Sequence, residues 1–455
     1  EGVRHGITLM IGSARPRAAA FGAARVVIYA EEEHRGVRMR RFHRGRRAVA
    51  VAGALAVAAL LAACSAEPAS TLTLPAQVEA SLPAETQAQL QTAVEQAVAA
   101  SGATGAVVGV WAPWSGTWQA GVGTSAPDAG EVTAATTFKA GAVTRAMTCD
   151  VLYGLAHDGV VALNDPVGDY VTGIAGAETT TLEQLCDSTS GLASYAPLID
   201  SRMRAAPERS WNPRELLAYG ISRGVATTPG TTFADSDTSY VLLGLALEHA
   251  SGRSAAQLYD TYVFGPAGMT ATALPTTADV GLSGLWSGDA EDGSVACAAP
   301  VDVTALSPTA GYTASGVISD LADLGRYAQA LAVGARDYDT DKRFANPLPV
   351  SADGPSWFTA DGRVYQAGSL VGQYGSVPGA LTAAFADSTT GMSVVVTLNN
   401  SRASSDLVRS LAWELAAIAS KAPAASGRTA PQAGLPWTAE DMAAQVTAAA
   451  GCPIP

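Results

Sequence analysis

The stretch FKAGAVTRAMTCDVLYGLAHDGVVALNDPV, residues 138–167, decides the fold of this chain. Apolar residues recur every four positions in its first half, at Val143, Met147, Val151 and Leu155, which predicts one apolar stripe along a helix. Gly159 supplies a stop signal at the C-terminal end of that helix. Because few polar residues interrupt the helix, we expect it to be packed on several sides, near the middle of a domain.

This stretch resembles the penicillin-recognising serine hydrolases, which comprise class C β-lactamases, D,D-carboxypeptidases and related esterases. In that family a phenylalanine and a small pair precede Ser-x-x-Lys, and the helix leads into the pattern L-x-x-x-G-x-(V/L)-x-L-D-D-P-V. The residues here that fit are Phe138, Gly141, Leu155, Gly159, Leu163, Asp165, Pro166 and Val167.

Four further blocks follow in the order that the family shows. Residues 181–192 are similar to T-I-x-x-L-L-T-H-T-S-G-L, residues 233–244 to F-x-Y-S-N-x-x-Y-x-L-L-G, and 264–272 and 314–324 to two later blocks. The resemblance covers roughly residues 83–420. It implies an α+β fold like that of β-lactamases and D,D-peptidases, with a five-stranded antiparallel sheet flanked by helices and a mostly α-helical lobe.

The catalytic positions of the family are altered in this sequence. Ala142 stands where the nucleophilic serine is expected, and Arg145 stands where the lysine base is expected. A guanidinium does not lose its proton in proteins, so Arg145 cannot act as that base. Asp235 and Asp237 replace the tyrosine and asparagine of the second motif. We expect Arg145 to pair with one of these carboxylates, so that an ion pair fills the old site.

The third motif of the family, Lys-Thr-Gly or His-x-Gly on a strand, should fall near residues 373–379, but neither tripeptide is present and the segment looks shortened. The resemblance places six further residues at the pocket. They are Ser188, Ser190, Gly191, Ser236, Tyr374 and Ser376.

A relocated active site is the alternative. The chain has three lysines, Lys139, Lys342 and Lys421, and none is preceded by serine three positions earlier; Thr136-x-x-Lys139 comes nearest. A serine–histidine–aspartate triad would need His157 or His249 as its base, and both positions are typical of ordinary core or surface histidines. We therefore expect that the family active site has been lost.

The N-terminal residues indicate export. Five arginines between residues 40 and 47 precede an apolar run at 48–61, and Leu61-Ala62-Ala63-Cys64 resembles a lipobox. The run is shorter than the roughly 20 residues of a membrane-spanning helix, which argues against an uncleaved anchor. We expect a lipoprotein signal peptide at 39–63, lipidation of Cys64, a linker at 64–82, and an extracytoplasmic protein tethered to the bacterial cell membrane.

Residues 1–38 are interpreted as upstream sequence that is not translated. The chain does not begin with Met, and the codons for Glu31-Glu32-Glu33 resemble a ribosome-binding site before a start at Val37 or Met39. A peptide from residues 1–36 in the expressed precursor would refute this interpretation.

The charge balance excludes one class of partner. Residues 1–63 hold 11 arginines and 4 glutamates, so 17 basic and 37 acidic residues remain, a net charge of −20. A domain this acidic is not expected to bind nucleic acid or anionic lipid through its surface.

The cysteines of an exported protein predict disulfides. With Cys64 lipidated, Cys149, Cys186, Cys297 and Cys452 remain, which allows two disulfides in three pairings, or four buried thiols. In the resembled family the central helix and the helix before the Ser-Gly-Leu loop are neighbours, which favours Cys149–Cys186. Cys297–Cys452 would then tether a C-terminal tail, residues 421–455, that carries one helix. Because the histidines lack ligand spacing to cysteine, we expect no metal and no cofactor.

Three functions remain open. The first is a catalytically inactive relative that binds or scaffolds in the cell envelope, with peptidoglycan or an envelope protein as partner. The second is an active serine hydrolase, a β-lactamase, D,D-peptidase or esterase, with a rebuilt site that uses Thr136, Ser188 or Ser236. The third is a carbohydrate-binding protein that uses Trp111, Trp114 and Trp118, although clustered aromatics are more typical of cross-strand packing.

Overall fold

The computed structural model describes residues 72–336, 338, 343–431 and 434–452, all within one unit, Ala66–Pro455. The expected upstream segment, the signal peptide and Cys64 lie outside the described residues. None of the described helices is long and apolar enough to cross a membrane.

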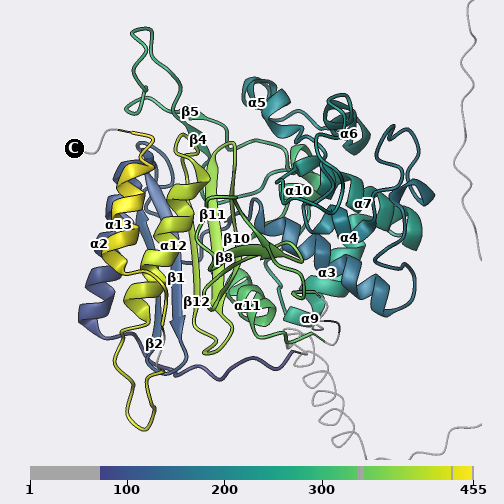
Figure 1. Ribbon diagram of the computed structural model, residues 1–455. Helices are drawn as coiled ribbons and strands as arrows, with labels where there is room; N and C mark the ends of the chain where they lie inside the picture. The colour runs from purple at the N-terminus through teal and green to yellow at the C-terminus, as the bar shows by residue number, and fades with distance from the viewer. Residues whose placement is uncertain (1–71, 337, 339–342, 432–433, 453–455) are drawn as a thin grey trace, which may run out of the picture. The chain divides into compact units, whose positions relative to one another are not determined.

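The main sheet is antiparallel, with the strand order β2-β1-β12-β11-β10-β9-β8-β7 (Figure 1). Its five longer strands are β1 (Gly105–Ala112), β2 (Gly116–Gly123), β10 (Leu370–Val377), β11 (Ala380–Asp387) and β12 (Ser393–Leu398). β1 and β2 form a hairpin, and β11 pairs with β12.

The expected number of five strands is corrected to eight among the described residues. Three short strands, β7 (Leu348–Pro349), β8 (Phe358–Asp361) and β9 (Val364–Ala367), extend the sheet beyond β10. Strands of two to four residues carry almost no alternation of apolar and polar side chains, so periodicity does not reveal them. β10 itself pairs with β11 over all eight residues.

Both faces of the sheet are buried along β11 and β12, which explains why apolar residues in these strands do not alternate with exposed polar ones. Val108 and Val396 point to a core that they share with α2 (Ala84–Ser101) and α12 (Ser405–Ala419). Val107 and Val395 point to the opposite core, which contains α3 (Val143–His157) and α11 (Leu321–Ala332). Figure 1 shows α2, α12 and α13 (Ala439–Ala448) together on one side of the sheet, with α11 on the other.

The expected α-helical lobe is built from short elements around α3. Residues 143–155 are buried throughout, as predicted for a helix packed on several sides. The lobe consists of α4 (Leu182–Cys186), α5 (Ala196–Ala205), α6 (Pro213–Ile221), α7 (Asp237–Ser251), α8 (Ala255–Tyr259), η2 (Asp260–Phe264), α9 (Gly265–Ala267) and α10 (Tyr312–Ser315), with the single turns η1 (Val167–Asp169) and η3 (Pro308–Ala310). Two small strand pairs complete the fold, β3 (Phe138–Lys139) with β6 (Ile318–Ser319) and β4 (Leu285–Trp286) with β5 (Val301–Asp302).

Both predicted disulfides are confirmed, Cys149–Cys186 between α3 and α4 and Cys297–Cys452 near the C-terminus. The helix expected in the C-terminal tail is α13, and it buries Met442 and Val446. The described part of the expected linker packs on the domain, because Leu82 is buried and its N–H donates to the carbonyl of Thr117 at 3.1 Å.

Candidate active site

A cavity of about 580 Å³ lies where the N-terminus of α3 meets β10 and the start of α7. Its walls include the residues that occupy the catalytic positions of the resembled family, together with two of the predicted pocket residues. These are Ala142, Arg145, Asp235, Asp237, Tyr374 and Ser376.

The nucleophile position carries only a methyl group. Ala142 is 2 % exposed and is the N-cap residue of α3, where it provides no side-chain cap. Gly375 on β10 faces it so closely that a Cβ at Gly375 would lie 2.4 Å from the Cβ of Ala142. The helix start and the strand are therefore in the contact that an acyl-transfer site needs, but no hydroxyl is present at this point.

Arg145 forms the ion pair that the sequence predicted, and it does so with both carboxylates. One terminal nitrogen donates to the two oxygens of Asp235 at 2.6 and 2.8 Å, and the other donates to Asp237. Burial alone would lower the pKa of Arg145, but the charges of Asp235 and Asp237 hold that pKa above its ordinary value. The residue at the position of the base therefore remains a cation.

Asp235 receives a second guanidinium, that of Arg363, at 2.9 Å. Desolvation in the pocket acts to raise the pKa of Asp235, but the charges of Arg145 and Arg363 outweigh it and lower this pKa to about 2. Asp237 is held from another side, where the hydroxyl of Ser194 donates to its carboxylate at 2.6 Å. These contacts form one network that ties α3, α7 and the sheet together.

Sequence reasoning missed Arg363, which lies in the turn between β8 and β9. Gly362 and Arg363 both have positive φ, 52° and 54°, as the two central residues of a tight hairpin turn do. The side chain of Arg363 is 1 % exposed, and its guanidinium also lies over the rings of Phe233, Tyr240 and Tyr365. Gly362, which adopts a positive φ without strain, is the sequence signal for this turn, although it says nothing about where Arg363 binds.

The other predicted pocket residues do not line this cavity. Ser188 is fully buried, and its hydroxyl lies 2.6 Å from that of Tyr240. Ser190 shares a hydrogen bond with Ser239 at 2.7 Å. Gly191 has a φ of +72° in the loop beside them, and Ser236 is the fully buried N-cap residue of α7. All four residues are buried, and none of them lines the cavity.

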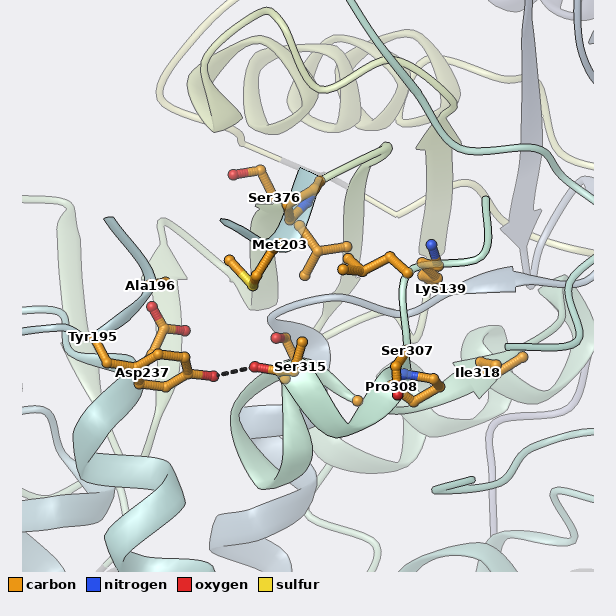
Figure 2. Close-up of a pocket in the computed structure, with 16 residues that line it drawn as sticks. Lys139, Tyr195, Ala196, Met203, Asp237, Ser307, Pro308, Ser315, Ile318 and Ser376 are labelled. Carbon is orange, nitrogen blue, oxygen red and sulfur yellow. Dashed lines mark hydrogen bonds between the residues drawn. The ribbon is translucent and has the colours of Figure 1, made fainter. Parts of the chain in front are cut away.

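A smaller cavity of about 50 Å³ adjoins the first and shares Asp237 and Ser376 with it. Figure 2 shows Tyr195 and Asp237 on one side of this cavity and Lys139 on the other. The ammonium group of Lys139 donates to the carbonyls of Thr304 and Val303 at 3.1 and 3.4 Å. Burial lowers the pKa of Lys139 to about 8, against the opposing charge of Asp302.

The histidines considered for a relocated triad lie away from both cavities. His157 ends α3 at the end opposite Ala142, and His249 lies near the end of α7 with its ring 6.4 Å from that of Tyr170. Among the described residues that line the larger cavity there is no histidine, lysine or cysteine. The described lining can hold a ligand by charge and by aromatic contact, and the only groups in it that can accept a proton from a serine hydroxyl are carboxylates.

A family model described as Beta-lactamase matches residues 90–420. The D-alanyl-D-alanine-carboxypeptidase/endopeptidase AmpH of Escherichia coli K12 is 31 % identical over 143 residues, which are 30 % of this chain and 36 % of that protein. A D-aminopeptidase of Cereibacter sphaeroides is 28 % identical over 132 residues, which are 29 % of this chain and 25 % of that protein. The chain thus matches about a third or less of the length of these relatives.

Solved structures show the same fold. A D-stereospecific amidohydrolase from a Streptomyces species superposes with a TM-score of 0.60 at 23 % identity, covering 69 % of this chain and 94 % of that one. The octameric penicillin-binding protein homologue from Pyrococcus abyssi gives 0.62 at 19 % identity, covering 73 % and 77 %. Since the family model spans most of the sequence and these structures share its fold, the chain belongs to the beta-lactamase family of penicillin-binding-like serine hydrolases.

Proposed function

We propose that this protein is a catalytically inactive member of its family, lipid-anchored outside the cytoplasmic membrane, that binds a ligand in the family pocket and serves as a binding or scaffolding protein of the cell envelope. One observation carries the proposal. The nucleophile position is the methyl group of Ala142, and the position of the base is a guanidinium held by Asp235 and Asp237.

The open cavity supports binding as the remaining role. A volume of about 580 Å³ falls within the range of small-molecule sites, and Trp286, Tyr365 and Tyr374 give it aromatic walls. AmpH and the D-aminopeptidase are named for peptides that contain D-amino acids, which occur in peptidoglycan. We therefore propose a D-amino-acid peptide of the cell wall as the ligand.

The absence of catalysis and the identity of the ligand are tested separately, the first by measuring turnover and the second by measuring binding. We expect no hydrolysis of nitrocefin, a D-alanyl anilide or a short-chain ester above the uncatalysed rate, with AmpH as the positive control. We expect saturable binding of a D-Ala-D-Ala peptide by calorimetry, weakened by Trp286→Ala. Turnover that disappears in Asp235→Ala would contradict the inactive assignment, and a peptide that fails to bind would contradict the ligand.

The alternative is an active hydrolase with a rebuilt site, and Lys139 is the observation that favours it. A lysine with a pKa of about 8 can supply a neutral amine as a base, and it lies in the cavity next to the pocket. If this alternative held, a hydrolytic rate would rise with pH through about 8 in the wild type and would be lost in Lys139→Met.

The anchor has its own test. Cells that express the chain and are fed a radiolabelled fatty acid should label the protein and retain it in the membrane fraction. The Cys64→Ala variant should lose both the label and the membrane retention, because acyl chains on Cys64 would supply the tether. Lipidation would be contradicted if the wild-type protein carried no label and if the membrane fraction retained it no better than the Cys64→Ala variant.

A further inference from the structure

A groove with a volume of about 890 Å³ lies between α2, α12 and α13, where Figure 1 shows these three helices side by side. It is distinct from the two cavities at the start of α3, because it shares no lining residue with either. Its floor is α12, and the segment that carries Leu435 and Trp437 forms part of its wall.

Glu414 lies on this floor and is only 6 % exposed. Among the described residues its carboxylate has neither a hydrogen-bond donor nor an ion-pair partner. Glutamate is almost never this deeply buried unless it is paired. The carboxylate oxygens of Glu414 remain accessible only from the groove that this residue lines. Since Glu414 faces the groove, a donor that compensates it can come from a molecule bound there.

The charged and polar groups around Glu414 indicate which charge a bound molecule should carry. The charged groups that face Glu414 across the groove are Glu85 on α2, Glu440 on α13 and Lys421 beyond the end of α12, which leaves the groove net negative when Glu414 is ionised. Along α2, the side chains of Gln89, Thr92 and Gln96 supply further hydrogen-bond acceptors.

Most of the remaining lining is apolar. Ala417 and Ile418 continue the floor along α12, and the indole of Trp437 stacks on Trp413 at 4.7 Å between ring centroids. A rigid aromatic and aliphatic surface next to a buried carboxylate suits a ligand with a hydrocarbon body and one cationic end.

We propose that this groove is a binding site for a primary alkylammonium compound, whose ammonium group donates to Glu414 while its hydrocarbon chain packs along Ile418 and Trp437. The proposal is independent of the pocket at Ala142, because no residue is shared. Three N–H donors on a compact cation match the acceptors around Glu414, and a quaternary ammonium, which has no donor, would match them less well.

Binding should depend on pH. Burial, together with the charge of Glu440, raises the pKa of Glu414 to about 7. The ligand needs the ionised carboxylate, so affinity should be high at pH 8 and should fall roughly thirtyfold by pH 5.5, following the ionised fraction of a group with this pKa. Lys421 is a positive charge in the lining of the groove and repels a cationic ligand, so its removal should tighten binding.

The test is calorimetric titration of residues 65–455 with hexylammonium chloride at pH 8 and pH 5.5, at constant ionic strength. Hexanol and hexanesulfonate, which have the same chain length, replace the cation by a neutral and an anionic group. We expect one saturable site for hexylammonium at pH 8, with no comparable binding of the other two compounds.

Variants locate the site. Glu414→Gln should weaken hexylammonium binding by tenfold or more, and Lys421→Met should strengthen it. Glu95→Gln, which changes a glutamate on α2 outside the groove, should leave it unchanged. The proposal would be overturned by the absence of saturable binding to the wild type at pH 8, by equal binding of hexanol, or by full affinity in Glu414→Gln.

Discussion

At the residue scale, the guanidinium of Arg145 meets two carboxylates in a site where the family is expected to carry a lysine base. Replacing it by Arg145→Met would leave Asp237 without its cation and Asp235 with Arg363 alone. We expect a loss of about 2 kcal/mol in the free energy of unfolding, below the full cost of stranding a buried charge because Asp235 is partly exposed. Urea denaturation at pH 7 measures it.

The matched control is Arg204→Met in the same cavity. Arg204 pairs with Asp200, whose side chain is 40 % exposed, so its loss should cost less than about 1 kcal/mol. Equal destabilisation by both substitutions would show that the Arg145 network contributes no more to the free energy of unfolding than the exposed pair of Arg204 and Asp200.

The same network predicts a pH dependence. The folded-state pKa of Asp235, about 2, lies below its ordinary value of 3.8. Its stabilising contribution is therefore complete above pH 3.8 and is lost as the pH falls through 2. The stability difference between the wild type and Arg145→Met should be constant from pH 7 to about 4 and should then shrink; a difference that grew on acidification would contradict this linkage.

The contribution of Glu414 to stability depends on pH in the opposite direction to that of Asp235. Its pKa of about 7 in the folded protein lies above the ordinary 4.5, so the stabilisation from protonation is complete below pH 4.5 and is lost as the pH rises through 7. Glu414→Gln should accordingly increase the free energy of unfolding at pH 8 by about 2–3 kcal/mol and therefore raise the melting temperature. At pH 4.5 the substitution should change both quantities little. Thermal melts of the two proteins at both pH values measure this effect.

The residues of the site were predictable to different degrees. Ala142, Arg145, Asp235 and Asp237 occupy motif positions, so a guanidinium next to two carboxylates could be expected from the sequence alone. Arg363 could not be expected, because it reaches Asp235 through a hairpin whose strands are too short to leave a pattern. The sequence also could not separate residues that line the cavity from buried residues that do not, such as Ser188 and Ser236.

At the scale of elements, the contact between the start of α3 and β10 depends on two small residues. In Gly375→Ala the new Cβ would collide with that of Ala142 at 2.4 Å, and overpacking of this kind costs about 1–3 kcal/mol. The other atoms nearest to the new Cβ at position 375 are the Cα and N of Ala142, which lie at ordinary contact distances of 3.7 and 3.8 Å. The double variant Ala142→Gly, Gly375→Ala should therefore recover stability relative to Gly375→Ala alone.

A double-mutant cycle of unfolding free energies checks this prediction. The single variant Ala142→Gly is measured as well, so that the effect of this substitution on the start of the helix can be subtracted. Additive free energies across the cycle would show that the two side chains are not in contact.

The apolar stripe of α3 predicted this helix, whereas no pattern in the sequence predicted the short strands β7 to β9. α3, α12 and the strands β1, β2, β11 and β12 carry apolar runs or stripes long enough to identify them. β7 to β9 have only two to four residues each, and their positions are set by pairing with the edge of the sheet at β10. For such segments, tertiary contacts outweigh any local propensity.

At the scale of the whole molecule, the chain has the fold of its family, and we propose that the reacting groups have changed. If the scaffold is intact, restoring those groups should restore acylation. We expect the variant with Ala142→Ser, Arg145→Lys, Asp235→Tyr and Asp237→Asn to form a penicillin adduct on residue 142. Ala142→Ser alone should not, because Arg145 cannot accept the proton of the hydroxyl. Gel fluorescence with a labelled penicillin compares the two.

The most direct test of catalytic inactivity is intact-mass spectrometry of residues 65–455 after incubation with a fluorescent penicillin and, separately, with a fluorophosphonate. We expect the wild-type protein to keep its unmodified mass with both reagents, and the carboxypeptidase AmpH is run under the same conditions for comparison. A stoichiometric adduct on a single hydroxyl of the wild-type chain would contradict the assignment, and peptide mapping of that adduct would identify the nucleophile.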